Sequence, residues 1–83
     1  MRLLYFAWVR QNLGKGEERY ARPDGVNTLC DLVIHLAARD SVYAEVFGHP
    51  ERLRAAINQT HAGFASPIAE GDEIAFFPPV TGG

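Results

Sequence analysis

The chain has 83 residues, enough for one domain with a modest core, so we expect a module that works against a larger partner. Apolar residues make up 47%, charged residues 22%, and the net charge is −2, which argues against nucleic-acid binding. A single cysteine, Cys30, excludes an internal disulfide and a cysteine-ligated cluster, and it favours a reducing, cytoplasmic location.

The first part of the chain is predicted to form two strands. Tyr, Phe, Trp and Val residues favour a strand from Arg2 to Arg10, and the glycines of residues 11–16 favour a loop. Residues 17–22 are mostly polar and predict a short edge strand, followed by a turn at Pro23-Asp24-Gly25. The apolar opening is too short for a signal-peptide core and nothing reaches a membrane span, so we expect no membrane association.

A helix is predicted to begin after Thr28, the N-cap residue, with Asp31 three positions later. Its core-facing positions recur at helical spacing: Leu29, Leu32, Val33 and Leu36. We expect Cys30 to be a buried, inert thiol and His35 to be solvated. A second short helix is predicted over Ser41 to Phe47, ended by Gly48.

The second half of the chain returns to strand signals. Strands are predicted over Leu53 to Ile57, briefly over Phe64 to Ile68 despite Pro67, and over Glu73 to Phe77. Turns are predicted at residues 58–60 and 70–72. This order favours an α+β domain over residues 1–77, with one main helix packed on a mixed sheet of four to five strands, and a tail over residues 78–83.

The predicted domain, residues 1–77, contains no group of residues typical of an active site. His35, His49 and His61 are spread along the chain without the spacing of metal ligands, so no metal site is expected. The acidic pairs at residues 17–18 and 72–73 are adjacent, and neighbours on a strand point to opposite faces.

The chemistry is instead expected at the C-terminus. Pro78 and Pro79 stiffen the exit from the last strand, Val80 and Thr81 follow, and Gly82-Gly83 end the chain without side chains. A carboxylate at the end of such a thin, extended tail can enter a narrow channel. Judged only from the two terminal glycines, however, a frayed terminus without any function is an equally good interpretation.

Three segments carry a resemblance to a known family over essentially the whole chain. They are residues 55–60 (AAINQT), residues 70–75 (EGDEIA) and the ending FFPPVTGG of residues 76–83. They resemble the molybdopterin synthase small-subunit family of ubiquitin-like sulfur carriers, and the resemblance implies a β-grasp fold.

The resemblance also implies a sulfur cycle at Gly83, with Gly82 giving clearance behind it. An ATP-dependent activating enzyme adenylates the Gly83 carboxylate, and a sulfurtransferase supplies sulfur to form a thiocarboxylate. The charged tail then donates sulfur to cyclic pyranopterin monophosphate in the large synthase subunit, within a heterotetramer of two small and two large subunits. The catalytic pocket is expected on the large subunit; this chain binds no cofactor, is no enzyme alone, and ATP is used by the activating enzyme.

Docking in this family uses an exposed apolar patch, whose positions match Phe6, Phe77 and His61. An aliphatic residue is more usual at the third position. Phe76 and Phe77 must face opposite ways, and we expect Phe77 to be the exposed one. The stem residues Pro78, Pro79, Val80 and Thr81 are expected to contact the partner as well.

Alternative functions remain open from the sequence. A thiamine-pathway sulfur carrier and a ubiquitin-like protein modifier share the fold and the Gly-Gly end, although the stem FFPPVT argues against both. A β-grasp binding or scaffold domain, whose tail has no chemistry, is a different class.

Overall fold

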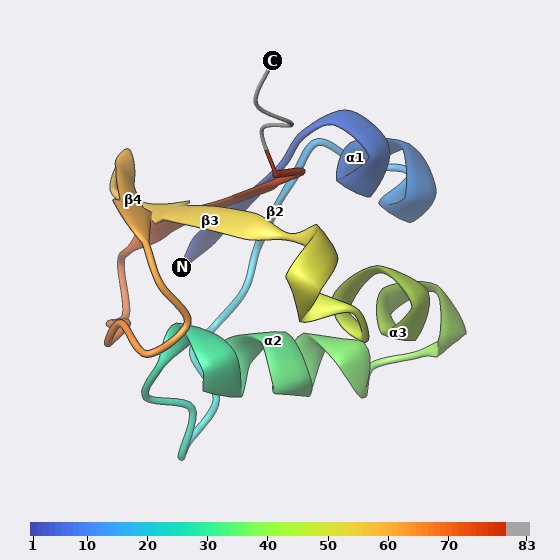
Figure 1. Cartoon of the computed structure of the whole chain (residues 1–83). Coiled ribbons are helices and arrows are strands. Elements are labelled where there is room, and N and C mark those ends of the chain that lie inside the picture. Colours follow the sequence, from blue (N-terminus) through green and yellow to red (C-terminus); the bar gives the residue numbers. More distant parts are fainter. Residues whose placement is uncertain (80–83) are drawn as a thin grey trace.

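The computed structural model describes residues 1–79, which form one mixed five-stranded sheet with helices against it (Figure 1). In chain order the elements are β1 (Arg2–Tyr5), α1 (Ala7–Leu13), β2 (Glu17–Arg19), α2 (Leu29–Ala37), α3 (Ser41–Phe47), the 3₁₀ turn η1 (Pro50–Arg52), β3 (Arg54–Ile57), β4 (Thr60–Ala62) and β5 (Glu73–Phe77). The strand order is β2-β1-β5-β3-β4, so β5, the last strand in the chain, lies at the centre.

Strands β1 and β5 pair in parallel, and every other pair is antiparallel. Helices α2 and α3 lie against one face of the sheet, and we call the other face the open face (Figure 1). The core between sheet and helices includes Leu3, Ile74 and Phe76 from the central strands and Leu32 and Leu36 from α2, all with no exposed surface. The predicted α+β, β-grasp arrangement is thereby confirmed.

Helix α2 begins where the sequence predicts. Oγ1 of Thr28 accepts a hydrogen bond from the Asp31 amide at 3.1 Å, while Oδ2 of Asp31 accepts one from the Thr28 amide at 3.2 Å. This reciprocal capping box satisfies two amides that the helix leaves free. Its predicted apolar stripe is buried, and the short helix over Ser41–Phe47 is confirmed, with Asp40 as its N-cap.

The first predicted strand is wrong beyond Tyr5. The chain turns at Ala7, which has a left-handed φ of 53°, and then forms α1 over the residues expected to be strand and loop. Val9 and Leu13 are one helical turn apart and bury into the core, and Gly14 ends the helix at φ 75°. Tertiary packing here overrides the strand propensity of Trp8 and Val9.

Two smaller predictions also need correction. The strand expected over residues 64–68 is absent from the described part of the chain, where only an isolated bridge joins Pro67 to Thr28. The fourth strand is instead Thr60–Ala62, the return arm of a hairpin with β3. The predicted strand over residues 17–22 ends at Arg19, although its place at the sheet edge is confirmed.

Candidate docking site on the open face

The stem of the tail leaves from the middle of the sheet. Strand β5 has β1 on one side and β3 on the other and ends at Phe77. Pro78 and Pro79 follow directly and are partly buried. The predicted tail residues Val80, Thr81, Gly82 and Gly83 lie outside the described residues.

The pleat of β5 separates its two phenylalanines. Phe76 is fully buried between Tyr5 and Phe47, with ring centroids 6.3 and 5.1 Å away. Phe77 points to the open face and is partly exposed, so it is the more exposed of the two, as the sequence predicted. The ring of His61 packs edge-on against Phe77, with 5.4 Å between the ring centroids.

His61 reaches Phe77 across β3. It is exposed on β4, at the edge of the sheet, and pairs in register with Ala56 of β3. Ala56 in turn pairs with Ala75 of β5, so only small side chains lie in the row between His61 and the central strand. The low profile of this row leaves the rings of Phe77 and His61 accessible to a flat partner surface.

Phe6 completes the predicted patch. It follows Tyr5, whose side chain is in the core, and keeps an extended backbone, so its side chain alternates to the open face. Its amide donates to the Phe76 carbonyl at 3.1 Å, which continues the β1–β5 ladder to the level of Phe77. With 47% of its surface exposed, Phe6 is an accessible aromatic side chain. We refer to Phe6, Phe77 and His61 as the aromatic patch.

The opposite end of the open face is polar. Arg2 on β1 forms ion pairs with Glu17 of β2 at 3.1 Å and with Glu73 of β5 at 3.2 Å. The aromatic patch therefore occupies the end of the sheet from which the tail leaves. Sequence reasoning missed Arg52, Arg54 and Trp8, which lie at this same end; no local motif marks them.

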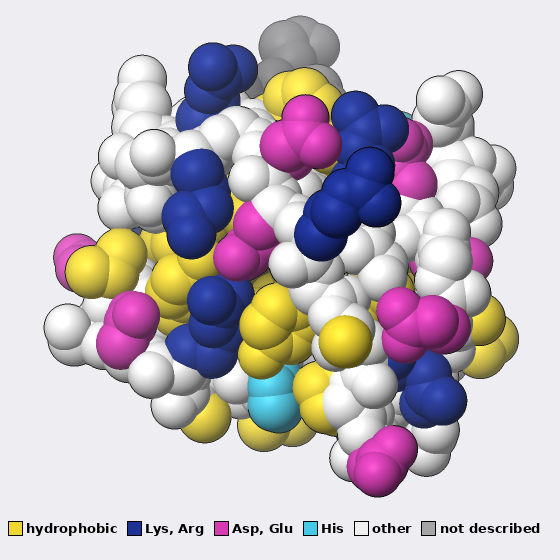
Figure 2. Space-filling view, turned by 180° about the vertical axis from the view of Figure 1, so that it is seen from behind, with side chains coloured by type: hydrophobic (Ala, Val, Ile, Leu, Met, Phe, Trp, Pro, Cys, Tyr) yellow, Lys and Arg dark blue, Asp and Glu magenta, His cyan; other side chains and the backbone are white. Residues whose placement is uncertain are grey.

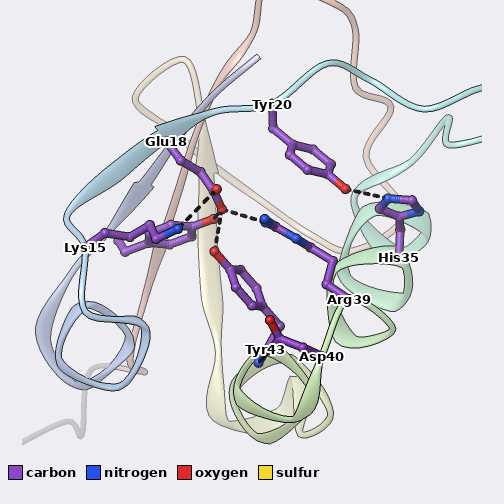
Figure 3. A network of polar contacts seen from close by, with 8 residues as sticks. Lys15, Glu18, Tyr20, His35, Arg39, Asp40 and Tyr43 are labelled. Carbon is purple, nitrogen blue, oxygen red and sulfur yellow. Dashed lines mark hydrogen bonds and ion pairs between the residues drawn. The ribbon is translucent and has the colours of Figure 1, made fainter.

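A second cluster of polar side chains ties the edge strand β2 to the helices (Figure 3). Oε1 of Glu18 accepts hydrogen bonds from Tyr5 at 2.6 Å, from Arg39 at 2.8 Å and from Tyr43 at 2.9 Å. Lys15 adds an ion pair at 3.6 Å. We call these residues the Glu18 cluster.

Two opposing effects act on Glu18. Burial disfavours its charged form, but the hydrogen bonds from Tyr5, Arg39 and Tyr43 outweigh burial and lower the pKa of Glu18. Burial, together with the hydrogen bond to Glu18, raises the pKa of Tyr5. On the face shown in Figure 2, basic and acidic side chains lie interspersed, an arrangement that favours local pairs of this kind. Among the described residues, no buried side-chain nitrogen or oxygen lacks a hydrogen-bond partner, so we assign the Glu18 cluster a role in stabilising the fold.

Two predictions about α2 are wrong. His35 is partly buried, because its Nε2 forms a 2.7 Å hydrogen bond with the hydroxyl of Tyr20. Cys30 is exposed and borders an apolar cavity of about 330 Å³ between α2, α3 and the segment before Pro67. The residues lining this cavity are Cys30, Val33, Ile34, Ala37, Phe47, Gly48, Pro50 and Phe64.

Within residues 1–79, no group of three or more His, Cys, Asp or Glu side chains is arranged to hold a metal ion. In the same residues, no helix combines the length and the apolar composition needed to cross a membrane.

The sheet order and the central exit of the tail define a ubiquitin-like β-grasp domain. A family profile described as the ThiS family matches residues 3–83, and the chain belongs to this family. Over its full length it is 40% identical to the molybdopterin synthase sulfur carrier subunit of Escherichia coli strain K12, and 37% identical to that of Haemophilus influenzae; in both cases 99% of the relative is covered.

Solved structures agree with the fold. SAMP1 from Haloferax volcanii superposes with a TM-score of 0.74 at 29% identity, covering 99% of this chain and 97% of that one. The HVO 2177 protein of the same organism has a TM-score of 0.76 at 26% identity, over 99% of this chain and 84% of that one.

Proposed function

We propose that this chain is the sulfur-carrier subunit of a molybdopterin synthase, and that the Gly83 carboxylate is the group that carries sulfur. The observation that carries the proposal is the 40% identity, over the whole chain, to a relative named as that subunit. The aromatic patch at the exit of the tail supports it, because a carrier needs a docking surface next to its reactive end.

Charging requires activation, because a carboxylate is a poor electrophile. An ATP-dependent activating enzyme joins the Gly83 carboxylate to the α-phosphate of ATP and releases pyrophosphate. Sulfur supplied by a sulfurtransferase at the oxidation level of hydrosulfide then attacks the acyl adenylate, and AMP leaves. The product is a C-terminal thiocarboxylate, whose sulfur is a soft nucleophile. Gly82 leaves the backbone free of a β-carbon where a narrow channel must close around it.

Delivery takes place on the large subunit. The aromatic patch docks there, and the stem Pro78 to Thr81 leads the thiocarboxylate into that subunit's pocket. The thiocarboxylate sulfur forms a bond to cyclic pyranopterin monophosphate, and water then cleaves the bond between this sulfur and the Gly83 carbonyl, which leaves the sulfur on the pterin and returns Gly83 as a carboxylate. The catalytic side chains belong to the large subunit, within a complex of two small and two large subunits, and this chain contributes no cofactor of its own.

The proposal is tested by charging the purified chain. It is incubated with the activating enzyme, ATP and a sulfurtransferase with its sulfur source, and intact mass is measured. We expect a gain equal to exchanging one oxygen for one sulfur, and no gain for a variant that lacks Gly83. A wild-type chain that stays uncharged while a known carrier is charged in parallel would contradict the proposal.

A protein modifier is the second candidate. The similarity to SAMP1, whose full name is small archaeal modifier protein 1, favours it. A modifier would join its Gly83 carboxylate to lysine side chains of other proteins. The same charging mixture, supplemented with cell extract, separates the two functions: isopeptide-linked conjugates indicate a modifier, whereas sulfur transfer to the pterin precursor without conjugates indicates a carrier. A thiamine-pathway carrier would charge equally but would not support molybdopterin formation.

A further inference from the structure

Arg54 lies beside the aromatic patch. It is the first residue of β3 and pairs in register with Phe77, so both side chains project from the open face. Arg54 is exposed, and its Nη1 donates only to the neighbouring Leu53 carbonyl, at 2.8 Å. No carboxylate among residues 1–79 forms an ion pair with it.

Arg52 reaches the same end of the molecule from the 3₁₀ turn. Its guanidinium lies 5.0 Å from the ring centroid of Trp8, two residues after Phe6 in the chain. This cation–π contact holds the arginine beside the segment that carries Phe6. Glu51 is next in sequence, but its carboxylate lies 3.6 Å from His49, and within residues 1–79 Arg52 has no ion pair.

The far end of the open face is balanced in part. Arg2 is matched there by Glu17 and Glu73, whereas its exposed neighbour Arg19 forms no ion pair among residues 1–79 and lies far from the aromatic patch. The end that carries the aromatic patch keeps the positive charge of Arg52 and Arg54, although the whole chain has a net charge of −2. An apolar centre with charges at its rim is the usual composition of a protein–protein interface.

Resting on the proposed function, we propose that the large synthase subunit presents carboxylates to Arg52 and Arg54, beside the pocket that receives the aromatic patch. An uncompensated positive rim next to a hydrophobic patch fits an acidic rim on the partner. Rim charges of this kind accelerate association and fix orientation more than they add affinity. The two arginines would thus orient the small subunit so that its stem points into the active site.

The test measures the association rate and the Kd of the purified chain with its large subunit, at about 50 mM and about 300 mM salt. We expect wild-type association to slow with salt. Arg54→Glu and Arg52→Glu should each raise the Kd by roughly three- to tenfold at the lower salt concentration and flatten the salt dependence. Arg54→Lys keeps the charge and should retain most of the salt dependence.

Arg19→Glu is the matched control. It makes the same charge change on the same open face, but three strands and four residues along the sheet from Arg54, about 20 Å away by strand spacing and rise. Even at the lower salt concentration, about 50 mM, that distance exceeds the screening length of roughly 14 Å, so the Kd of this control should stay near wild type.

Three outcomes would overturn the proposal. Salt-independent binding, with both Arg→Glu variants within twofold of wild type, would show that the partner has no acidic rim. An unchanged Kd with a raised KM for the pterin precursor would place the arginines against the substrate phosphate instead. Either result leaves the proposed function standing, whereas a wild-type chain that fails to bind the large subunit at any salt concentration would refute both.

Discussion

Phe76 and Phe77 are adjacent in the sequence, yet they have opposite environments because successive side chains of a strand alternate. Phe76 is packed among the aromatic rings of the core, and the ring of Phe77 packs against His61 on the open face. An alanine at position 76 is therefore expected to affect mainly folding stability, and an alanine at position 77 mainly partner binding.

We predict that Phe77→Ala weakens binding to the large subunit by about 1–3 kcal/mol, the range expected of an aromatic interface anchor. Its thermal stability should fall little, because the side chain is only partly buried. Phe76→Ala, the control, should lose about 3–5 kcal/mol of folding free energy through the cavity it leaves. Calorimetric titration and urea denaturation measure the two effects. Wild-type affinity for a folded Phe77→Ala chain would exclude Phe77 from the interface.

At the scale of elements, one carboxylate on the edge strand β2 connects this strand to the helical layer, in addition to the pairing of β2 with β1. Glu18 accepts hydrogen bonds from the hydroxyls of Tyr5 on β1 and Tyr43 on α3, and from the guanidinium of Arg39 between α2 and α3 (Figure 3). A glutamine at this position keeps one acceptor oxygen but loses the negative charge, and its NH2 group faces three donors. The charge-assisted hydrogen bonds are thereby weakened or lost, and hydrogen bonds to a charged group contribute more than neutral ones.

We predict that Glu18→Gln lowers the free energy of unfolding by about 2–3 kcal/mol near neutral pH. Because the folded state lowers the pKa of Glu18, its contribution is present above the unfolded pKa of about 4.3 and is lost as pH falls through the lower folded value. The stability difference between wild type and variant should therefore shrink from about pH 6 to about pH 3. Urea denaturation at several pH values measures this, and a constant difference would contradict the account.

The β3–β4 hairpin contains a second testable position. Its two turn residues, Asn58 and Gln59, both have positive φ, 50° and 70°, between paired Ile57 and Thr60. Such turns favour Asn-Gly, and a non-glycine residue is strained at the second position. We predict that Gln59→Gly stabilises the domain by about 0.5–1 kcal/mol, read as a higher melting temperature. Asn58→Ala should destabilise it; an unstable Gln59→Gly chain would show that Gln59 has a role in packing.

The sequence predicted elements well where local chemistry decides them. Thr28 and Asp31 mark the start of α2, and the apolar residues of the segment 73–77 indicate β5. The prediction from the sequence was wrong at Ala7. The left-handed backbone of this alanine is imposed by the packing of Val9 and Leu13, because alanine itself does not favour that conformation. Val9, Leu13 and the following Gly14 are nevertheless a short helical signal that could have revealed α1.

The exposure of Cys30 could not be predicted either, because it depends on which segment of the chain packs beside α2. It lies on α2 beside the apolar stripe, where a neighbouring segment could equally well have covered it. For the candidate site, alternation alone predicted that Phe76 and Phe77 diverge. Only the sheet register brings Phe6 and His61 to the same face, and that register depends on pairings between distant segments.

At the scale of the whole molecule, the central strand of the sheet leads directly into the tail. Strand β5 pairs with β1 on one side and with β3 on the other, so two ladders of hydrogen bonds fix the position from which the stem leaves. The aromatic patch lies at the same end as Arg52 and Arg54, neither of which forms an ion pair with a carboxylate among residues 1–79. Docking and delivery are thus expected from one end of the molecule, and no reactive group is needed in the body.

The most direct test of the central claim is molybdopterin formation by chains altered only at the tail, in a purified system with the large subunit, the activating enzyme and a sulfur source. Removing Gly83, or adding one residue after it, displaces the terminal carboxylate by about 3.5 Å, and far smaller misplacements can cost roughly a hundredfold in rate. We predict that both variants melt at the wild-type temperature and form almost no product. Near-wild-type product formation by the chain without Gly83 would contradict the account.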